Sequence, residues 1–337
     1  MTARQARDLV TRARAGGPRS DTGPSPAAPP ATGSHFVVLV KPEVMTPSAA
    51  PEAVAEAVRV LGEAEVDVRR AAVVPAGEFA RRGYLLLHYP RLHRLAADGP
   101  AVLTSGARRE LRSLTASTGT GDVLGAYAAM TREAGLTPQA LDERCRDAGI
   151  HKLDSGSYAS VTEPAGGPVI VLNGFLPALA EGYTGGGAAA SVGLLECHSH
   201  REIDALRGEV LGALHPARAA PGSLRGALGA LARSRGIAVS EGRNAVHLSA
   251  GHLEGMFQAW RYFAAADGRG IESTAFGASL AERGVPVTSV AELAADRNLT
   301  EDSGETISPH GATEGLRRED ALDRVRAWAT GKGLGTT

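Results

Sequence analysis

The chain has 337 residues, of which 43% are hydrophobic and 22% are charged, a composition typical of a soluble globular protein with one or two domains. Its 36 Lys and Arg residues nearly balance its 37 Asp and Glu residues, which excludes the global positive field that gathers nucleic acid or an anionic membrane. The two cysteines, Cys145 and Cys197, form neither a disulfide framework nor a CxxC metal module. No apolar stretch reaches the length of a membrane span, and the first residues lack the apolar block of a secretion signal. We therefore expect a cytoplasmic protein that binds neither membrane nor nucleic acid.

Residues 1–34 are predicted to form a disordered tail. Within them, residues 16–34 combine Pro, Gly and Ser with almost no large apolar residue, so they bury too little surface to offset the entropy lost on ordering. Folded structure is expected to begin at His35, because residues 36–40 form a β-branched run suited to a buried strand.

Hydrophobic spacing predicts alternating strands and helices in the rest of the chain. This pattern favours an α+β fold, and a ferredoxin-like core with a split βαβ unit and an antiparallel sheet is its simplest arrangement. We expect the core at residues 35–104 and 166–267, a mostly helical insertion at 105–165, and a C-terminal extension at 268–337. The expected elements are a helix at 51–62, a strand at 65–74, helical segments at 77–97 and 107–114, strands at 168–172 and 192–197, a helix at 203–214, a short strand at 237–239 and a helix at 253–266.

Three short motifs carry the functional information. They are VLVKPE, which ends at Glu43, PGSLRG at Pro221–Gly226, and EGRNAVHLS at Glu241–Ser249. Together they resemble the nucleoside diphosphate kinase family, whose first strand ends in a Lys-Pro-Asp step and whose active site follows a Pro-Gly-Thr-Ile-Arg-Gly segment and an Asn-x-x-His step. Each motif is weak alone, but the combination is specific. The matching segments cover roughly half of the chain.

The resemblance implies a phosphotransferase in which His247 is transiently phosphorylated, so that one difficult transfer becomes two easier steps with ping-pong kinetics. Transfer of a γ-phosphoryl group also needs positioned cations to neutralise the spreading charge. By resemblance, Lys41 and Arg225 hold the transferred and adjacent phosphates, and Asn244 binds the sugar hydroxyl. Arg207 is similar to the family's other phosphate-binding arginine, displaced by one position. Another expected nucleotide-binding residue is Tyr89, which resembles the family tyrosine near the catalytic histidine.

The chain departs from the family pattern around this histidine. The family has Gly-Ser-Asp after it, whereas this chain has Leu248–Ala250, and the threonine expected ahead of the Leu-His-Pro step is Leu214. The family carboxylate that orients the imidazole falls on Gln258 by direct counting, and Glu254 lies one helical turn away. A carboxylate fixes the imidazole tautomer and makes the ring more nucleophilic, so both residues are candidates for the catalytic shell of His247. The aromatic platform that stacks the base has no clear counterpart.

Two functions remain open from the sequence. The first is transfer of the γ-phosphoryl group of ATP or another nucleoside triphosphate to a nucleoside diphosphate or a related, more specialised acceptor. Mg²⁺ would then be held by the nucleotide phosphates and water, with no protein metal site. The second is a catalytically weak or inactive nucleotide-binding or assembly module of the same fold. The resemblance also implies a homo-oligomer. CHSH at Cys197–His200 is not expected to bind metal, since its cysteine and histidines face opposite sides of a strand.

Overall fold

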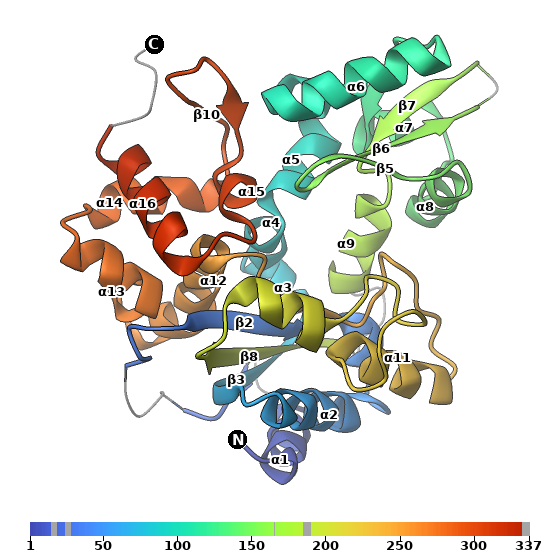
Figure 1. Cartoon of the computed structure of the whole chain (residues 1–337). Coiled ribbons are helices and arrows are strands. Elements are labelled where there is room, and N and C mark those ends of the chain that lie inside the picture. The colour runs from blue at the N-terminus through green and yellow to red at the C-terminus, as the bar shows by residue number, and fades with distance from the viewer. Residues whose placement is uncertain (15–18, 24–27, 165, 185–189, 332–337) are drawn as a thin grey trace. The chain divides into compact units, whose positions relative to one another are not determined.

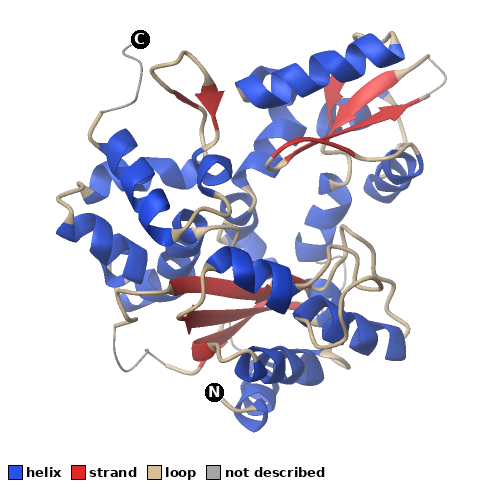
Figure 2. Ribbon diagram, in the orientation of Figure 1, coloured by secondary structure: helices blue, strands red, loops and turns tan. Residues whose placement is uncertain are grey.

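The computed structural model describes residues 1–14, 19–23, 28–164, 166–184 and 190–331, and the chain divides into two units (Figure 1). The first unit contains Met1–Gly83, Gly182–Ala294 and Thr313–Thr330, and the second contains Tyr84–Glu181 and Ala295–Ala312. Helices and sheets occur in both, so the predicted mixed α+β class is confirmed (Figure 2).

The first unit is built on a five-stranded sheet whose neighbouring strands are all antiparallel, in the order β1-β3-β8-β2-β9. The interior strand β2 is buried along its whole length, as its β-branched run predicts. The short strand β9 at the edge is part of the EGRNAVHLS motif, and the strand predicted at 237–239 is not formed. The strands are β1 (Ser20–Asp21), β2 (Ser34–Val40), β3 (Asp67–Pro75), β8 (Ser191–Ser199) and β9 (Val246–Leu248).

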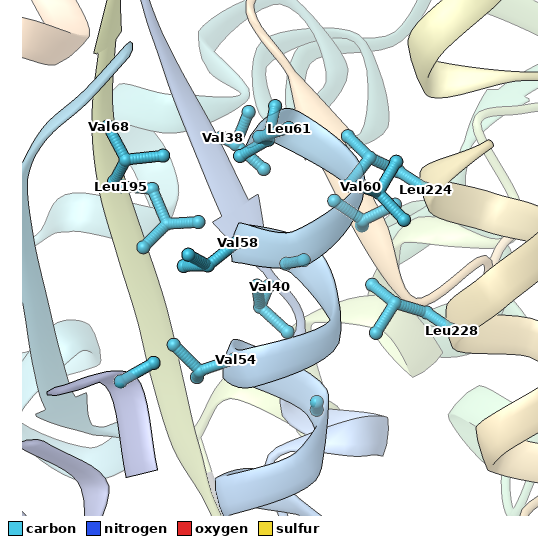
Figure 3. Close-up of a cluster of buried hydrophobic side chains, with 14 of the residues drawn as sticks. Val38, Val40, Val54, Val58, Val60, Leu61, Val68, Leu195, Leu224 and Leu228 are labelled. Atoms are coloured by element: carbon cyan, nitrogen blue, oxygen red, sulfur yellow. The ribbon is translucent and has the colours of Figure 1, made fainter. Parts of the chain in front are cut away.

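Helices of this unit cover the sheet. Helices α2 and α11 share one apolar cluster with β2, β3 and β8, because Val54, Val58 and Leu61 recur at helical spacing on α2 (Figure 3). Helix α12 contacts β2. The helices are α1 (Ala3–Arg14), α2 (Ala50–Glu63), α3 (Ala76–Arg81), α10 (Ile203–Ala205), α11 (Leu224–Ser234), α12 (His252–Ala259), α13 (Ala275–Glu282), α14 (Val287–Glu292) and α16 (Arg318–Ala329), with π-helical segments at Leu206–Leu211 and Trp260–Ala264.

The N-terminal residues differ from the predicted disordered tail. Helix α1 forms because Ala6, Leu9 and Val10 lie at three- and four-residue spacing, and all three are buried in the same cluster as α2. Strand β1 pairs with β3, and the Asp21 carboxylate accepts a hydrogen bond from Arg70 at 2.8 Å. The Pro- and Gly-rich composition that predicts a disordered tail belongs to residues 16–34 and does not extend to residues 3–14, which carry this apolar stripe. Residues 15–18 and 24–27 of the predicted tail lie outside the described residues.

Replacing Leu9 with alanine is expected to lower the free energy of unfolding by about 3 kcal/mol, because the substitution leaves a cavity in a fully buried site. Urea unfolding of the full chain measures this change. The control is Arg7→Ala, an exposed position on the same helix, where the expected change is below about 0.5 kcal/mol. Equal small effects at both positions would show that α1 adds nothing to the core.

The second unit has its own four-stranded sheet, in the order β4-β7-β6-β5, and a two-stranded sheet of β10 and β11. Its segment begins at Tyr84 and ends at Glu181, so the predicted insertion at 105–165 was too short. The physical reason is that β7, expected in the core sheet, pairs with β6 in a hairpin and with β4 in parallel. The strands are β4 (Val123–Gly125), β5 (His151–Asp154), β6 (Ser157–Thr162), β7 (Val169–Leu172), β10 (Leu299–Thr300) and β11 (Thr306–Ile307).

The helices of the second unit include α5, which begins with a proline at its first turn and follows Tyr89 as N-cap. The predicted C-terminal extension is not one piece, because residues 268–294 and 313–330 belong to the first unit and 295–312 to the second. No helix within the described ranges is long and apolar enough to cross a membrane. The remaining helices are α4 (Tyr84–His88), α5 (Pro90–Asp98), α6 (Ser105–Thr118), α7 (Ala126–Arg132) and α8 (Pro138–Asp147), and the unit boundaries fall within α9 (Leu176–Thr184) and α15 (Pro309–Thr313).

Candidate active site

Strand β9 and helix α12 position His247. Its neighbours Val246 and Leu248 belong to the apolar cluster on one face of the sheet, so strand alternation turns His247 to the opposite face. There the imidazole Nε2 lies 2.9 Å from Oε1 of Glu254, in the first turn of α12. The His247 side chain is 18% exposed, which leaves it shielded but within reach of a ligand.

A chain of hydrogen bonds holds Glu254 in place. The amide Nε2 of Gln258 donates to Oε1 of Glu254 at 2.5 Å, and the Ser249 hydroxyl donates to Oε1 of Gln258 at 2.7 Å. The backbone N–H of Val37, on β2, donates to the same hydroxyl oxygen at 3.0 Å. The two residues that the sequence left as alternatives therefore act in series: Glu254 contacts the histidine, and Gln258 contacts Glu254.

The contact with Glu254 fixes the protonation of the imidazole. An ionised carboxylate only accepts hydrogen bonds, so Nε2 of His247 carries the proton and Nδ1 carries the lone pair. Burial lowers the pKa of His247, and the positive charges of Arg207 and Lys41 lower it further, against the opposing effect of Glu254. The ring is therefore neutral at neutral pH, which is the form that can act as a nucleophile.

Two backbone segments are locked together beside this histidine. The N–H of Lys41 donates to the carbonyl of Ala245 at 2.8 Å, and the N–H of Ala245 donates to Oε1 of Glu43 at 3.0 Å. These bonds hold Ala245 at a φ of 68°, a left-handed conformation that is uncommon for residues other than glycine. The strained turn joins the Lys-Pro-Glu step at the end of β2 to the Asn-x-x-His step.

Asn244 directs a polar atom into this region. Its Nδ2 donates to the carbonyl of Glu241 at 2.8 Å, which fixes the orientation of the amide. Its Oδ1 is buried and accepts no hydrogen bond within the part of the chain that the structure describes. Because an unsatisfied buried acceptor costs about 1–3 kcal/mol, this oxygen is a natural partner for a ligand hydroxyl.

Cations surround the same region. The pKa of Lys41 is lowered to about 8, mainly by burial; the charge of Glu43 raises it, and the neighbouring charge of Arg225 lowers it. The Lys41 ammonium donates to the carbonyl of Gly242 at 3.3 Å. A lysine that is buried close to an arginine, at the end of a central strand, is suited to binding an anion that supplies the missing negative charge.

The two arginines come from separate elements. Arg225 is the second residue of α11, whose N-cap Ser223 accepts a hydrogen bond from a backbone N–H, and its Nη1 donates to the carbonyl of Gly212 at 3.0 Å. Arg207 extends from the π-helical segment, and its Nη1 donates to the carbonyl of Leu248 at 3.4 Å. Its Nη2 lies 2.9 Å from the Glu314 carboxylate.

The first unit thus brings together seven of the eight predicted site residues. Tyr89, the eighth, belongs to the second unit. There the centroid of its ring lies 4.4 Å from that of the His88 ring, in an edge-on arrangement. Leu214 is 50% exposed. The seven are Lys41, Arg207, Arg225, Asn244, His247, Glu254 and Gln258.

Three residues of the site, Glu43, Ser249 and Glu314, have no role predicted from the sequence. Glu43 is the last residue of the VLVKPE motif, so the sequence did indicate that it lies near the site. Ser249 follows the histidine by two residues, and strand alternation could have placed it. Glu314 is 107 residues from Arg207 in a polar segment without a motif, so nothing local pointed to it.

Neither a group of metal ligands nor a similar protein adds to the assignment of this site. Within the described ranges, no group of three or more His, Cys, Asp or Glu side chains is arranged to hold a metal ion. In comparisons with protein-family models, curated proteins and solved structures, the chain has no match.

Proposed function

We propose that the first unit is a nucleoside-diphosphate-kinase-like phosphotransferase in which Nδ1 of His247 is the nucleophile. Nδ1 attacks the γ-phosphorus of a nucleoside triphosphate, and the bond from that phosphorus to the β,γ-bridging oxygen breaks. The nucleoside diphosphate leaves with the electron pair. A terminal phosphate oxygen of the acceptor then attacks the phosphorus of the phosphohistidine, and the bond between phosphorus and Nδ1 breaks and returns its electron pair to the imidazole. The observation that carries the proposal is the neutral, largely buried imidazole whose Nε2 is held by Glu254 at 2.9 Å.

The strand order supports a ferredoxin-like core of the nucleoside diphosphate kinase type. Without the edge strand β1, the order is β3-β8-β2-β9, with α2 between β2 and β3 and α11 between β8 and β9. A split βαβ core produces this order when its first and third strands pair at the centre of an antiparallel sheet. The end of the central strand then lies beside the edge strand that carries the nucleophile.

The other side chains fit the parts of a nucleotide. Lys41, Arg207 and Arg225 would neutralise the phosphates, since charge spreads over the equatorial oxygens as the phosphoryl group transfers. Asn244 would accept a hydrogen bond from a sugar hydroxyl through Oδ1. Mg²⁺ would arrive as part of the nucleotide substrate and neutralise charge on its phosphates, while the protein supplies the cations and the nucleophile.

The experiment follows the phosphoryl group. We would incubate the full chain with γ-labelled ATP and Mg²⁺, quench in base, and measure label that is stable in base and lost in acid. Adding nucleoside diphosphates one at a time should release this label as the corresponding triphosphate, and the panel then identifies the acceptor. ATP binding without label would instead support a non-catalytic nucleotide-binding module. That alternative is favoured by one observation, the pairing of Arg207 with a carboxylate.

Nucleotide affinity is expected to fall as the pH rises through about 8. Lysine is a cation below its pKa, and the pKa of Lys41 is lowered from 10.5 to about 8, so Lys41 is mostly charged at pH 7 and mostly neutral at pH 9. Calorimetric titration with MgATP between these pH values measures the change. Lys41→Gln should bind weakly with no such dependence. A parallel fall in both proteins would assign the dependence to another group.

A further inference from the structure

The segment Thr313–Arg318, which we call the C-terminal strap, packs on the loop that follows His247. A Cβ atom added to Gly251 would lie 2.9 Å from the carbonyl oxygen of Thr313 and 3.4 Å from the Cα of Glu314. The φ of Gly251 is −163°, which any residue adopts, so the close approach of the strap is what requires glycine there. The backbones of the strap and of this loop are therefore in direct contact.

A tight turn presents Glu314. The N–H of Leu316 donates to the carbonyl of Thr313 at 3.4 Å, and Gly315, the third residue of the turn, has a φ of 69°. That conformation favours glycine at this position of a β-turn. Thr313 is 1% exposed, so the turn begins from a buried residue and Glu314 occupies its second position.

The far end of the strap is also anchored. The N–H of Arg318 donates to Oε2 of Glu202 at 3.3 Å, and its guanidinium donates to the carbonyl of Ala275 at 3.3 Å and to the hydroxyl of Ser279 at 2.6 Å. Arg318 is 8% exposed. Contacts on both sides of the turn hold Glu314 in one place, so its position is built into the fold of the first unit.

Glu314 makes the kind of contact with Arg207 that a phosphate would make. Nη2 of Arg207 donates to Oε1 of Glu314 at 2.9 Å, and both side chains are more than two-thirds shielded from solvent, at 27% and 28% exposed. Guanidinium groups bind carboxylate and phosphate oxygens with the same donors. The same Arg207 donates to the carbonyl of Leu248, the residue next to His247. The Arg207 guanidinium thus connects the Glu314 carboxylate to the backbone of Leu248, the residue that follows His247.

We infer that Glu314 lowers the affinity of this site for polyphosphates, because its carboxylate takes a phosphate-oxygen position on Arg207 and its side chain must be displaced when a polyphosphate binds. The inference rests on the proposed function for the identity of the site. Its consequence is that the wild-type chain binds nucleotide polyphosphates more weakly than its three cations alone would allow. A strap that is held at both ends makes this competition a fixed property of the site.

The test compares MgATP affinity by calorimetry at constant ionic strength. Glu314→Gln and Glu314→Ala are each expected to bind MgATP about fivefold more tightly than wild type, because a partly shielded ion pair no longer competes. Glu314→Asp keeps the charge but shortens the side chain, so it should lie between these variants and wild type. The matched control is Asp320→Asn, which removes the same charge from an exposed position on α16 and should change affinity by less than about twofold.

The outcomes separate this inference from the proposed function. Unchanged or weaker affinity in folded Glu314→Gln and Glu314→Ala overturns the inference, while labelling of His247 in the same preparations would leave the phosphotransferase proposal standing. Tighter binding in variants that never become labelled supports the role of Glu314 and removes the chemistry. If no protein in the series binds MgATP, both fail. Melting temperatures establish which variants are folded. If Glu314→Gln and Glu314→Ala are not folded, the MgATP affinity of Glu314→Asp decides the test: binding tighter than wild type supports the inference, and unchanged or weaker binding overturns it.

Discussion

Replacing His247 with asparagine is expected to remove the acid-labile label and to slow phosphoryl transfer from ATP by roughly 10³-fold or more. The amide cannot form the covalent intermediate, so the two-step route is lost, whereas the cations that we propose for phosphate binding remain. Binding of MgATP should therefore change far less than turnover. Label incorporation and a coupled assay of triphosphate formation measure the chemistry, and calorimetry measures the binding.

The control for this variant is His200→Asn, which removes a histidine from an exposed position at the end of β8. It should label at the wild-type rate. Persistence of acid-labile label in His247→Asn would assign the nucleophile to another residue and would leave the contact between His247 and Glu254 as a structural one.

Replacing Glu254 with alanine is expected to slow phosphohistidine formation by about 10²-fold, because the imidazole loses both its orientation and the charge that makes Nδ1 more nucleophilic. Glu254→Gln separates the two effects. Oε1 of Glu254 accepts from both His247 and Gln258, and the oxygen of a glutamine could accept both bonds without the charge. Glu254→Gln should therefore label faster than Glu254→Ala and more slowly than wild type.

Rapid-quench measurement of label formation at several MgATP concentrations distinguishes a slower chemical step from weaker binding. Glu209→Ala, at an exposed glutamate paired with Arg201, controls for the loss of one carboxylate from the first unit. Label formation at the wild-type rate in Glu254→Ala would mean that the hydrogen bond to Nε2 has no part in the chemistry.

The part of the site that was predictable from sequence lies within short motifs. Lys41, Arg225, Asn244 and His247 all lie in the three motifs that resemble the nucleoside diphosphate kinase family, so this resemblance indicated all four. The choice between Gln258 and Glu254 was not local. Residues four apart lie on one face of a helix, so counting along α12 could not decide which one meets the imidazole.

Contacts between distant segments were not predictable. Glu314 reaches Arg207 only because the strap folds back over the loop after His247, and polar residues of a C-terminal segment carry no signal of that path. The predicted insertion at 105–165 was shorter than the second unit for a related reason. A run such as VIVL at β7 predicts a strand, but hydrophobic pattern alone does not say which sheet the strand joins.

The central claim is that His247 carries the phosphoryl group on Nδ1, and locating that group tests it most directly. The wild-type chain would be labelled with γ-labelled ATP and Mg²⁺, digested under alkaline conditions, and the modified peptide and ring nitrogen identified by mass spectrometry and ³¹P NMR. We predict one modified peptide, the one that contains His247, with phosphorus bound to Nδ1, because Glu254 holds Nε2. Phosphorus on Nε2, on another residue, or on no residue at all would contradict the claim.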